Sequence, residues 1–274
     1  MTGRLVLCAT PIGHLGDASP RLADALAEAD VILSEDTRRA RVLLDHLGVG
    51  TRPESYHAGN EADRSARLAQ LLEEGASVAL ISDAGTPAVA DPGLSAVRIA
   101  RRVGAEVSVI PGPSAVVAAL AVSGLPSERF VFEGFLPRRG KERSARLAAL
   151  VAEVRTIVLF SAKARVVEDL SALTGALGDD RRITVSRELT KAHEEVWSGT
   201  LGEAVEEWSR RRPLGEFTLV VQGSPGLVTP IERAVGEINA RIEGGEPMSE
   251  AVRRVADGLG MSRRTLYEAV LRQR

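Results

Sequence analysis

Residues 76–93 read ASVALISDAGTPAVADPG, an apolar run followed by a loop that is rich in Gly, Pro and Asp. The run at 76–81 has the length and residue types of a buried β-strand. The twelve residues after it hold two prolines, two glycines and two aspartates, and these residue types restrict the backbone at several points. The stretch predicts a strand that ends in a rigid, acid-bearing loop.

The same pattern recurs along the first half of the chain. Apolar runs at 5–9, 31–34 and 107–110 end in TPIGHLGD, EDTRR and PGPS, and amphipathic stretches typical of helices lie between the runs. This alternation indicates an α/β fold with a mainly parallel sheet. Ligands of such sheets bind beyond the carboxyl ends of the strands. Most of these loops are built from small residues that expose the backbone, so we expect a pocket that binds a small polar molecule.

The second half repeats the α/β pattern with apolar runs at 156–161, 182–186 and 217–223. The remaining tail has helical periodicity, Gly breaks and no strand pattern. We therefore predict an N-terminal α/β domain over 1–115, a C-terminal α/β domain over 116–225 and a small helical extension over 226–274.

The composition limits the classes of protein to which this chain can belong. The 274 residues are 44% hydrophobic, and the formal net charge of −2 provides no overall attraction to nucleic acid or membrane. Any polyanion must bind to a local basic patch. The single cysteine, Cys8, excludes an intrachain disulfide, and no stretch resembles a signal peptide or a membrane span. We expect a cytoplasmic protein, and the scattered histidines predict no metal site.

The sequence GHLG at 13–16 raises the alternative of a dinucleotide site. Glu35 and Asp36 end the second predicted strand, where such a site uses an acidic residue. The spacing GxGxxG is absent, however, so the fingerprint is incomplete.

Six ordered motifs together resemble the tetrapyrrole methylase superfamily, and within it the branch that methylates ribosomal RNA. They are ATPIGHLGD, SEDTRR, SDAGTPAVADPG, IPGPSAVVAALAVSGLP, FEGFLPRR and SRELTKAHEEV.

The resemblance implies two α/β domains with S-adenosylmethionine in the cleft between them, usually in a homodimer. It also implies 2′-O-methylation of a cytidine in the decoding centre of 16S rRNA, with the small ribosomal subunit as partner. A preformed loop loses little entropy when it binds a ligand, and this is the physical advantage of a rigid loop at 82–93. The residues that the resemblance assigns to the cofactor are Pro11, Ile12, Gly13, Asp83, Ala84, Gly85, Thr86, Pro87, Ala90, Pro111, Gly112, Ser114, Ala115, Phe160, Glu216, Phe217 and Thr218.

Transfer of a methyl group to a ribose hydroxyl needs alignment and is helped by a base or a nearby cation. We expect Asp36 or Glu188 to serve as the base or to orient the hydroxyl, and Arg38 and Lys191 to contact RNA phosphate. The alternatives are an acid cluster that caps a helix at 35–38 and a solvated turn at 187–195.

A basic run at 137–150 offers Arg138, Arg139, Lys141 and Arg143 for RNA. Aromatic residues are only 3% of the chain, so phosphate contacts rather than base stacking should dominate the binding. The alternative is an ordinary solvated start of a helix.

Two segments depart from the family pattern. LFSAKAR at 159–165 lacks the aromatic residue, acid, Pro and His that are usual there, and PLGEF at 213–217 lacks the usual Lys before Gly-Glu. Phe160, Arg165 and Glu216 are retained. These departures therefore affect the expected contacts to the target and not those to the cofactor.

Two further functions remain open. The tail SEAVRRVADGLGMSRRTLYEAVLRQR also has the pattern of a helix-turn-helix, which would suit a ligand-sensing DNA-binding regulator. A methylase of the same superfamily with a small-molecule or protein substrate would share the cofactor cleft. Sequence-specific binding of duplex DNA without methyl transfer would identify the regulator.

Overall fold

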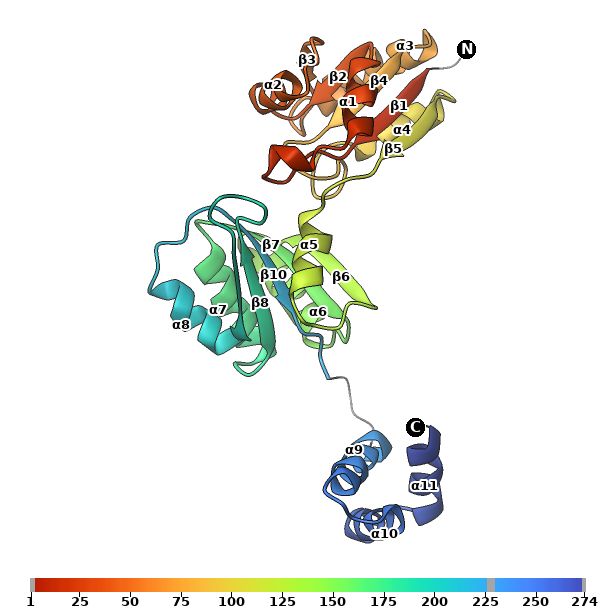
Figure 1. Cartoon of the computed structure of the whole chain (residues 1–274), viewed down its shortest axis with the longest axis vertical. Coiled ribbons are helices and arrows are strands. Elements are labelled where there is room, and N and C mark those ends of the chain that lie inside the picture. The colour runs from red at the N-terminus through yellow and green to blue at the C-terminus, as the bar shows by residue number, and fades with distance from the viewer. Residues whose placement is uncertain (1–2, 226–229, 273–274) are drawn as a thin grey trace. The chain divides into compact units, whose positions relative to one another are not determined.

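A computed structural model of the chain describes residues 3–225 and 230–272. The chain divides into two compact units, Met1–Gln222 and Gly223–Arg274, which are described separately (Figure 1). The first unit contains both sheets, and the second contains helices.

The first sheet has the order β3-β2-β4-β1-β5, and every neighbouring pair is parallel. The mainly parallel sheet predicted from the alternating pattern is therefore confirmed. Because the strands are parallel, their carboxyl ends lie at one edge, and the loops that the sequence singled out follow there. The strands are β1 (Arg4–Cys8), β2 (Val31–Ser34), β3 (Pro53–Ser55), β4 (Ser77–Ile81) and β5 (Glu106–Ile110), and the helices are η1 (Leu15–Asp17), α1 (Pro20–Ala27), α2 (Thr37–His46), α3 (Glu61–Glu73) and α4 (Leu94–Arg102).

Helices cover both faces of this sheet, which is why its strands read as continuous apolar runs. Along β1, Leu5 packs in one core cluster, while Val6 and Cys8 pack in the cluster on the opposite face. Cys8 is fully buried, and burial raises the pKa of its thiol to about 12. This cysteine is a core residue.

The second sheet has the order β6-β7-β10-β8-β9, and only the pair β6-β7 is parallel. The parallel pattern of the first sheet therefore does not continue. The predicted apolar runs correspond to β7, β8 and β10, whereas β6, β9 and the helix α8 (Leu201–Ser209) were not predicted. Helix α8 begins at a capping box formed by Thr200 and Glu203. The strands are β6 (Phe130–Phe135), β7 (Thr156–Ala162), β8 (Arg182–Arg187), β9 (Glu195–Thr200) and β10 (Glu216–Val221).

Helices α6 (Gly140–Val151), α7 (Val166–Leu177) and α8 (Leu201–Ser209) pack with one face of this sheet around Trp208 and Phe217. Helix α5 (Ala115–Val122) follows β5 in sequence but packs against β7 and β10 through Val116, Ala119 and Leu120. Figure 1 shows α5 beside β7 and β10. The chain thus passes from the first sheet to the second before α5.

The second unit consists of α9 (Pro230–Glu243), α10 (Met248–Leu259) and α11 (Arg263–Arg272), which share one apolar core. Helix α10 ends at Gly260, whose φ of +65° is left-handed and suits glycine. The ends of the predicted extension, 226–229 and 273–274, lie outside the described residues.

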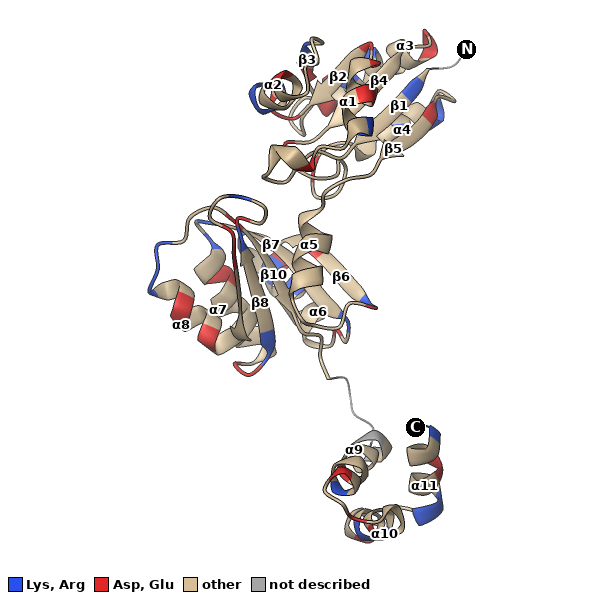
Figure 2. Ribbon diagram, in the orientation of Figure 1, with Lys and Arg blue, Asp and Glu red and all other residues tan. Residues whose placement is uncertain are grey.

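The turn between α10 and α11 lies where the sequence suggested a helix-turn-helix. Figure 2 shows both basic and acidic residues in this unit. Arg263 and Arg264, at the start of the would-be recognition helix, pair with Asp257 at 2.8 Å and Glu268 at 3.0 Å. None of the helices described within 3–225 and 230–272 is long and apolar enough to cross a membrane.

Candidate functional site

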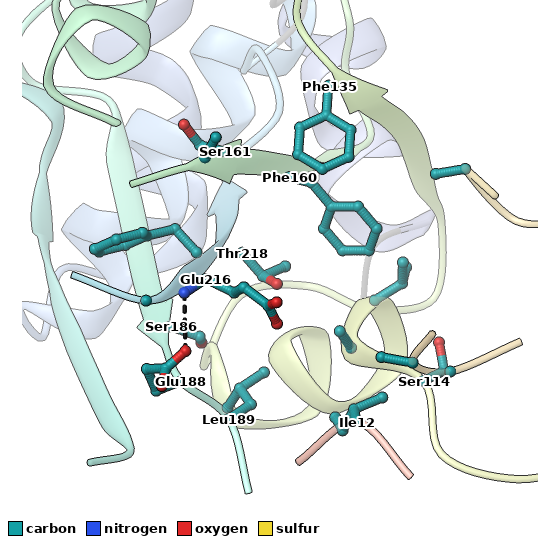
Figure 3. A pocket seen from close by; sticks show the side chains of 18 of the residues that line it. Ile12, Ser114, Phe135, Phe160, Ser161, Ser186, Glu188, Leu189, Glu216 and Thr218 are labelled. Carbon is teal, nitrogen blue, oxygen red and sulfur yellow. Dashed lines mark hydrogen bonds between the residues drawn. The ribbon is translucent and has the colours of Figure 1, made fainter. Parts of the chain in front are cut away.

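A cavity of about 560 Å³ lies between the loops of the first sheet and the strands of the second. Figure 3 shows its lining, with Phe135 and Phe160 from the second sheet and Ile12 and Ser114 from the loops after β1 and β5. The predicted cofactor residues on the lining are Ile12, Ala84, Gly85, Thr86, Ala90, Ser114, Ala115, Phe160, Glu216, Phe217 and Thr218.

Six of the residues assigned to the cofactor lie outside the lining. Asp83 accepts a hydrogen bond from the backbone N–H of Asp36 at 2.9 Å and pairs with Arg39 at 3.4 Å. Gly112 lies close to Ala9, which a Cβ at this glycine would meet at 3.1 Å. Those outside the lining are Pro11, Gly13, Asp83, Pro87, Pro111 and Gly112.

The loop at 82–93 has a strained backbone and is held by hydrogen bonds. Ala88 and Ala90 have left-handed φ values of +67° and +62°, which cost energy for residues other than glycine. The backbones of Thr10 and Gly85 exchange two hydrogen bonds, at 2.9 and 3.1 Å, which tie the loop to the end of β1. Strained backbone of this kind clusters at ligand sites, which makes this loop a candidate binding surface.

The loop after β8 is held by an ionic contact. Glu188, at φ +52°, accepts a hydrogen bond from Lys191 at 2.8 Å. It also accepts one from the backbone N–H of Glu216 at 2.9 Å, which Figure 3 shows. Lys191 also contacts the carboxylate of Glu216 at 3.0 Å. Burial alone would raise the pKa of Glu188, but the hydrogen bonds from Lys191 and Glu216 outweigh it, and the pKa is lowered.

The loops after β1 and β8 touch directly at Gly13. A Cβ at this position would lie 2.5 Å from Cγ of Lys191 and 2.6 Å from Oγ1 of Thr190. The backbone N–H of His14 donates a hydrogen bond to the hydroxyl of Thr190 at 3.2 Å. The absence of a side chain at Gly13 therefore permits the contact that joins the two sides of the cavity.

Aromatic rings form one wall of the cavity. The ring of Phe160 lies 4.9 Å from that of Phe132 and 5.5 Å from that of Phe135, measured between centroids. Residues three apart on a regular strand point to opposite faces. A register shift between Phe132 and Gly134, where φ is +63°, turns both rings toward Phe160.

Polar side chains continue this wall across the sheet. Phe160, Thr218 and Ser186 are paired in a row across β7, β10 and β8. All three line the cavity, and the hydroxyl of Ser186 is buried without a hydrogen-bond partner. A buried polar group normally has a partner, so this hydroxyl fits a bound ligand with a polar atom at that point.

Acidic side chains gather at the first-sheet end of the cavity. Burial, followed by the charge of Glu35 and then that of Asp83, raises the pKa of Asp91 to about 6. Burial and the charge of Asp83 also raise the pKa of Glu35. Asp91 lines the cavity, and the sequence analysis did not select it. The sequence signal that could have identified Asp91 is its place next to Ala90, in a loop already predicted to bind the cofactor.

The predicted catalytic residues Asp36 and Arg38 lie off the cavity lining. Asp36 caps α2, and its carboxylate binds the guanidinium of Arg38 at 2.9 Å. Hydrogen bonds from the side chain and backbone of Arg38 lower the pKa of Asp36 to about 2. Of the four predicted catalytic residues, only Glu188 lines the cavity, and Lys191 is bound to it.

The basic run divides into exposed and buried residues. Arg138, Arg139 and Lys141 are exposed. Arg143 was predicted to bind RNA, but only 8% of its surface is exposed, and its guanidinium is bound to Asp169 at 2.9 Å. The prediction for Arg143 is corrected because α6 turns this side chain into the protein.

The sequence analysis also missed several lining residues. Most lie next to a predicted residue, and Phe135 and Ser186 fall inside the quoted motifs FEGFLPRR and SRELTKAHEEV. The bulge that turns Phe135 toward the cavity, however, leaves no clear signal in the sequence. These residues are Arg39, Val89, Asp91, Val116, Phe135, Ser161, Ala162, Lys163, Ser186, Leu189 and Gly215. Within the described ranges, no group of three or more His, Cys, Asp and Glu side chains is placed to hold a metal ion.

Comparison with solved structures shows the same fold. The methyltransferase CobJ aligns with a TM-score of 0.62 and 21% identity over 82% of this chain and 95% of that one. Diphthine synthase aligns with a TM-score of 0.60 and 18% identity over 80% of this chain and 89% of that one. A family model described as Tetrapyrrole (Corrin/Porphyrin) Methylases matches residues 4–205.

Sequence relatives are closer. A protein of a Synechocystis species named Ribosomal RNA small subunit methyltransferase I is 42% identical over 98% of each chain. The protein of the same name from Mycobacterium tuberculosis is 43% identical over 100% of this chain and 96% of its own. The chain therefore belongs to the tetrapyrrole methylases and, within them, to the ribosomal RNA small subunit methyltransferase I family.

The contact at Gly13 gives a test of the site's geometry. Gly13→Ala should lower the free energy of unfolding by about 1–3 kcal/mol, because the new methyl group meets Lys191 and Thr190. Denaturant unfolding measures the change. Gly50→Ala is the matched control, since its added Cβ meets nothing within 4 Å. Equal stability of the two variants would mean that the loops are not packed as described.

Proposed function

We propose that the protein transfers a methyl group from S-adenosylmethionine to the ribose 2′-hydroxyl of a cytidine in the decoding centre of 16S rRNA. The observation that carries this proposal is the nearly full-length similarity to proteins named Ribosomal RNA small subunit methyltransferase I. The small ribosomal subunit or its rRNA is then the partner, and the site of action is the cytoplasm.

The cavity suits the cofactor in size and chemistry. Its volume of about 560 Å³ lies in the range of small-molecule sites. Phe160 offers an apolar ring, Ser186 an unpaired buried hydroxyl, and the loop at Gly85 and Thr86 a rigid backbone. These residues would hold S-adenosylmethionine, which supplies an electrophilic methyl group on a sulfonium. Because the loop is already rigid, the chain can bind and orient the cofactor with little loss of conformational entropy.

We infer that Asp91 accepts the proton of the ribose hydroxyl. Its carboxylate lines the cavity, and a base is most effective when its pKa lies near the working pH. The sequence proposed Asp36 or Glu188 for this role. The lowered pKa of each favours a different role, because each carboxylate is already neutralised by a cation. Glu188 then positions Glu216, and Asp36 positions the start of α2.

We expect the exposed basic turn to bind the RNA. Arg138, Arg139 and Lys141 have no carboxylate within ion-pair distance in the described part of the chain, whereas Arg38 and Lys191 are both paired. Unpaired cations gain most from binding phosphate, because no existing pair has to break. We therefore propose these three residues as the main phosphate contacts and Arg38 and Lys191 as secondary ones.

We also propose that the protein forms a homodimer through α5. The sequence of this helix, AVVAALAV, is apolar on all sides, which is typical of a buried helix. Val117 and Val122 are nevertheless 58% and 51% exposed. A second copy that covers this face would remove the exposed apolar surface from water.

The direct test of the function is transfer of labelled methyl from S-adenosylmethionine to small ribosomal subunits of a strain that lacks the gene. Nuclease digestion and mass spectrometry should identify 2′-O-methylcytidine at one decoding-centre position. Methylation of a small molecule or protein instead would favour another substrate of the superfamily. Sequence-specific binding of duplex DNA without methyl transfer would favour the regulator.

The role of Asp91 predicts a pH dependence. A base must be deprotonated, so kcat/KM should rise as the pH passes through about 6 and then level off. Asp91→Asn should lower kcat by about 100-fold or more and remove this step. Asp45→Asn, on the exposed side of α2, is the control and should keep the wild-type profile. A wild-type profile in Asp91→Asn would assign the proton to another group, and Asp36→Asn and Glu188→Gln would then be compared.

The proposed dimer predicts a difference between two exposed valines. Val117→Glu should convert the dimer to a monomer, because it buries a charge in the apolar interface. Val42→Glu, at a residue that is 60% exposed on α2, should leave the dimer intact. Sedimentation or light scattering measures both. A wild-type protein that is monomeric at all accessible concentrations would refute the dimer.

A further inference from the structure

A buried ionic cluster lies beneath the basic turn at 136–139. Its centre is Asp169 of α7, a residue with only 2% of its surface exposed. One carboxylate oxygen of Asp169 accepts hydrogen bonds from Arg143 at 2.9 Å and Arg165 at 3.1 Å, and the other accepts from the hydroxyl of Ser161 at 2.6 Å. We name these four residues the Asp169 cluster.

The two arginines of the cluster also hold the backbone of the turn. Arg143 donates to the carbonyl of Pro137 at 3.0 Å. Arg165 donates to the carbonyls of Leu136 at 3.2 Å and Pro137 at 3.3 Å. Two consecutive carbonyls are therefore fixed by guanidinium groups, immediately before the exposed residues Arg138 and Arg139.

The other end of the cluster belongs to the cavity wall. Ser161 lines the cavity next to Phe160. Phe135, which precedes the turn, lies against Phe160 on the same wall. The cluster thus bonds at once to the wall of the proposed methyl-transfer site and to the turn that carries exposed positive charge.

Stability alone is a weak reason for such a cluster. Burying ions carries a desolvation cost, and well-packed apolar residues often replace a buried ion pair without loss. A planar guanidinium, in contrast, donates several hydrogen bonds in a fixed geometry, which suits the orientation of a loop. The contacts to Leu136 and Pro137 are of this kind.

We propose that the Asp169 cluster is a positioning element that sets the place of the turn at 136–139 relative to the cavity. Arg138 and Arg139 then bind RNA phosphates at a fixed distance from the methyl-transfer site. This inference rests on the proposed function, because it takes RNA as the substrate. Asp169, Arg143 and Arg165 act through the turn and do not touch the reacting atoms.

The test is a double-mutant cycle in the full-length protein, with small ribosomal subunits as the RNA probe. Asp169→Asn keeps the size of the side chain and an acceptor for Ser161 but removes the charge that holds both arginines. It should raise KM for the subunits about tenfold and leave kcat and cofactor affinity within about twofold. The slope of log affinity against log salt concentration should become shallower by about 1 for each phosphate that the variant no longer binds.

The decisive measurement is the same substitution in a protein that already carries Arg138→Ala and Arg139→Ala. If the cluster acts by placing these arginines, Asp169→Asn should have almost no further effect on KM there, and the cycle should be strongly non-additive. An equal effect in both backgrounds, or none in the wild type, would overturn the inference.

Two further variants make the result independent of misfolding. Arg165→Lys keeps the charge beside Asp169 but replaces the two guanidinium nitrogens that reach Leu136 and Pro137 with a single ammonium nitrogen on a flexible stem. It should therefore reproduce the rise in KM in a folded protein. Glu153→Gln, which breaks the separate pair with Arg155, should leave KM unchanged. If the wild-type protein neither binds nor methylates the subunits, the proposed function itself fails, whatever the variants do.

Discussion

The cavity depends on the close approach of two loops that are far apart in the sequence. Gly13 follows the first strand of the first sheet, and Thr190 and Lys191 follow a strand of the second. The space at Gly13 has no room for a Cβ, so one residue type permits the contact. Lys191 continues it through Glu188 to the backbone of Glu216, which lines the cavity. The absence of a side chain at Gly13 therefore permits the contact between the two sides of the site.

The rest of the site divides into preformed surfaces with separate tasks. The strained loop at Ala88 and Ala90 offers a fixed backbone, whereas the row from Phe160 to Ser186 offers an apolar ring and an unpaired hydroxyl. Burial and neighbouring acids raise the pKa of Asp91 to about 6, unlike the carboxylates that bind Arg38 and Lys191. Similar residue types thus acquire different chemistry from their neighbours.

The helical unit at the end of the chain has its own core. The relative from Thermotoga maritima aligns over 221 residues, which is 81% of this chain but 99% of its own length. It is thus about as long as the unit Met1–Gln222. A relative of the same name is therefore about a fifth shorter than this chain.

Local patterns in the chain were enough to predict four of the five strands of the first sheet and the loops that follow them, but not the short edge strand β3. Apolar runs and Gly- and Pro-rich strand ends are signals that neighbouring residues carry. The family could also be predicted, through ordered motifs that span nearly the whole chain. The antiparallel pairing of β8, β9 and β10 became visible only in the folded protein, since pairing depends on distant partners. The same holds for the burial of Arg143 and for the place of Phe135 in the cavity wall. Burial, strand register and the pKa of a carboxyl group all depend on residues that meet only after folding.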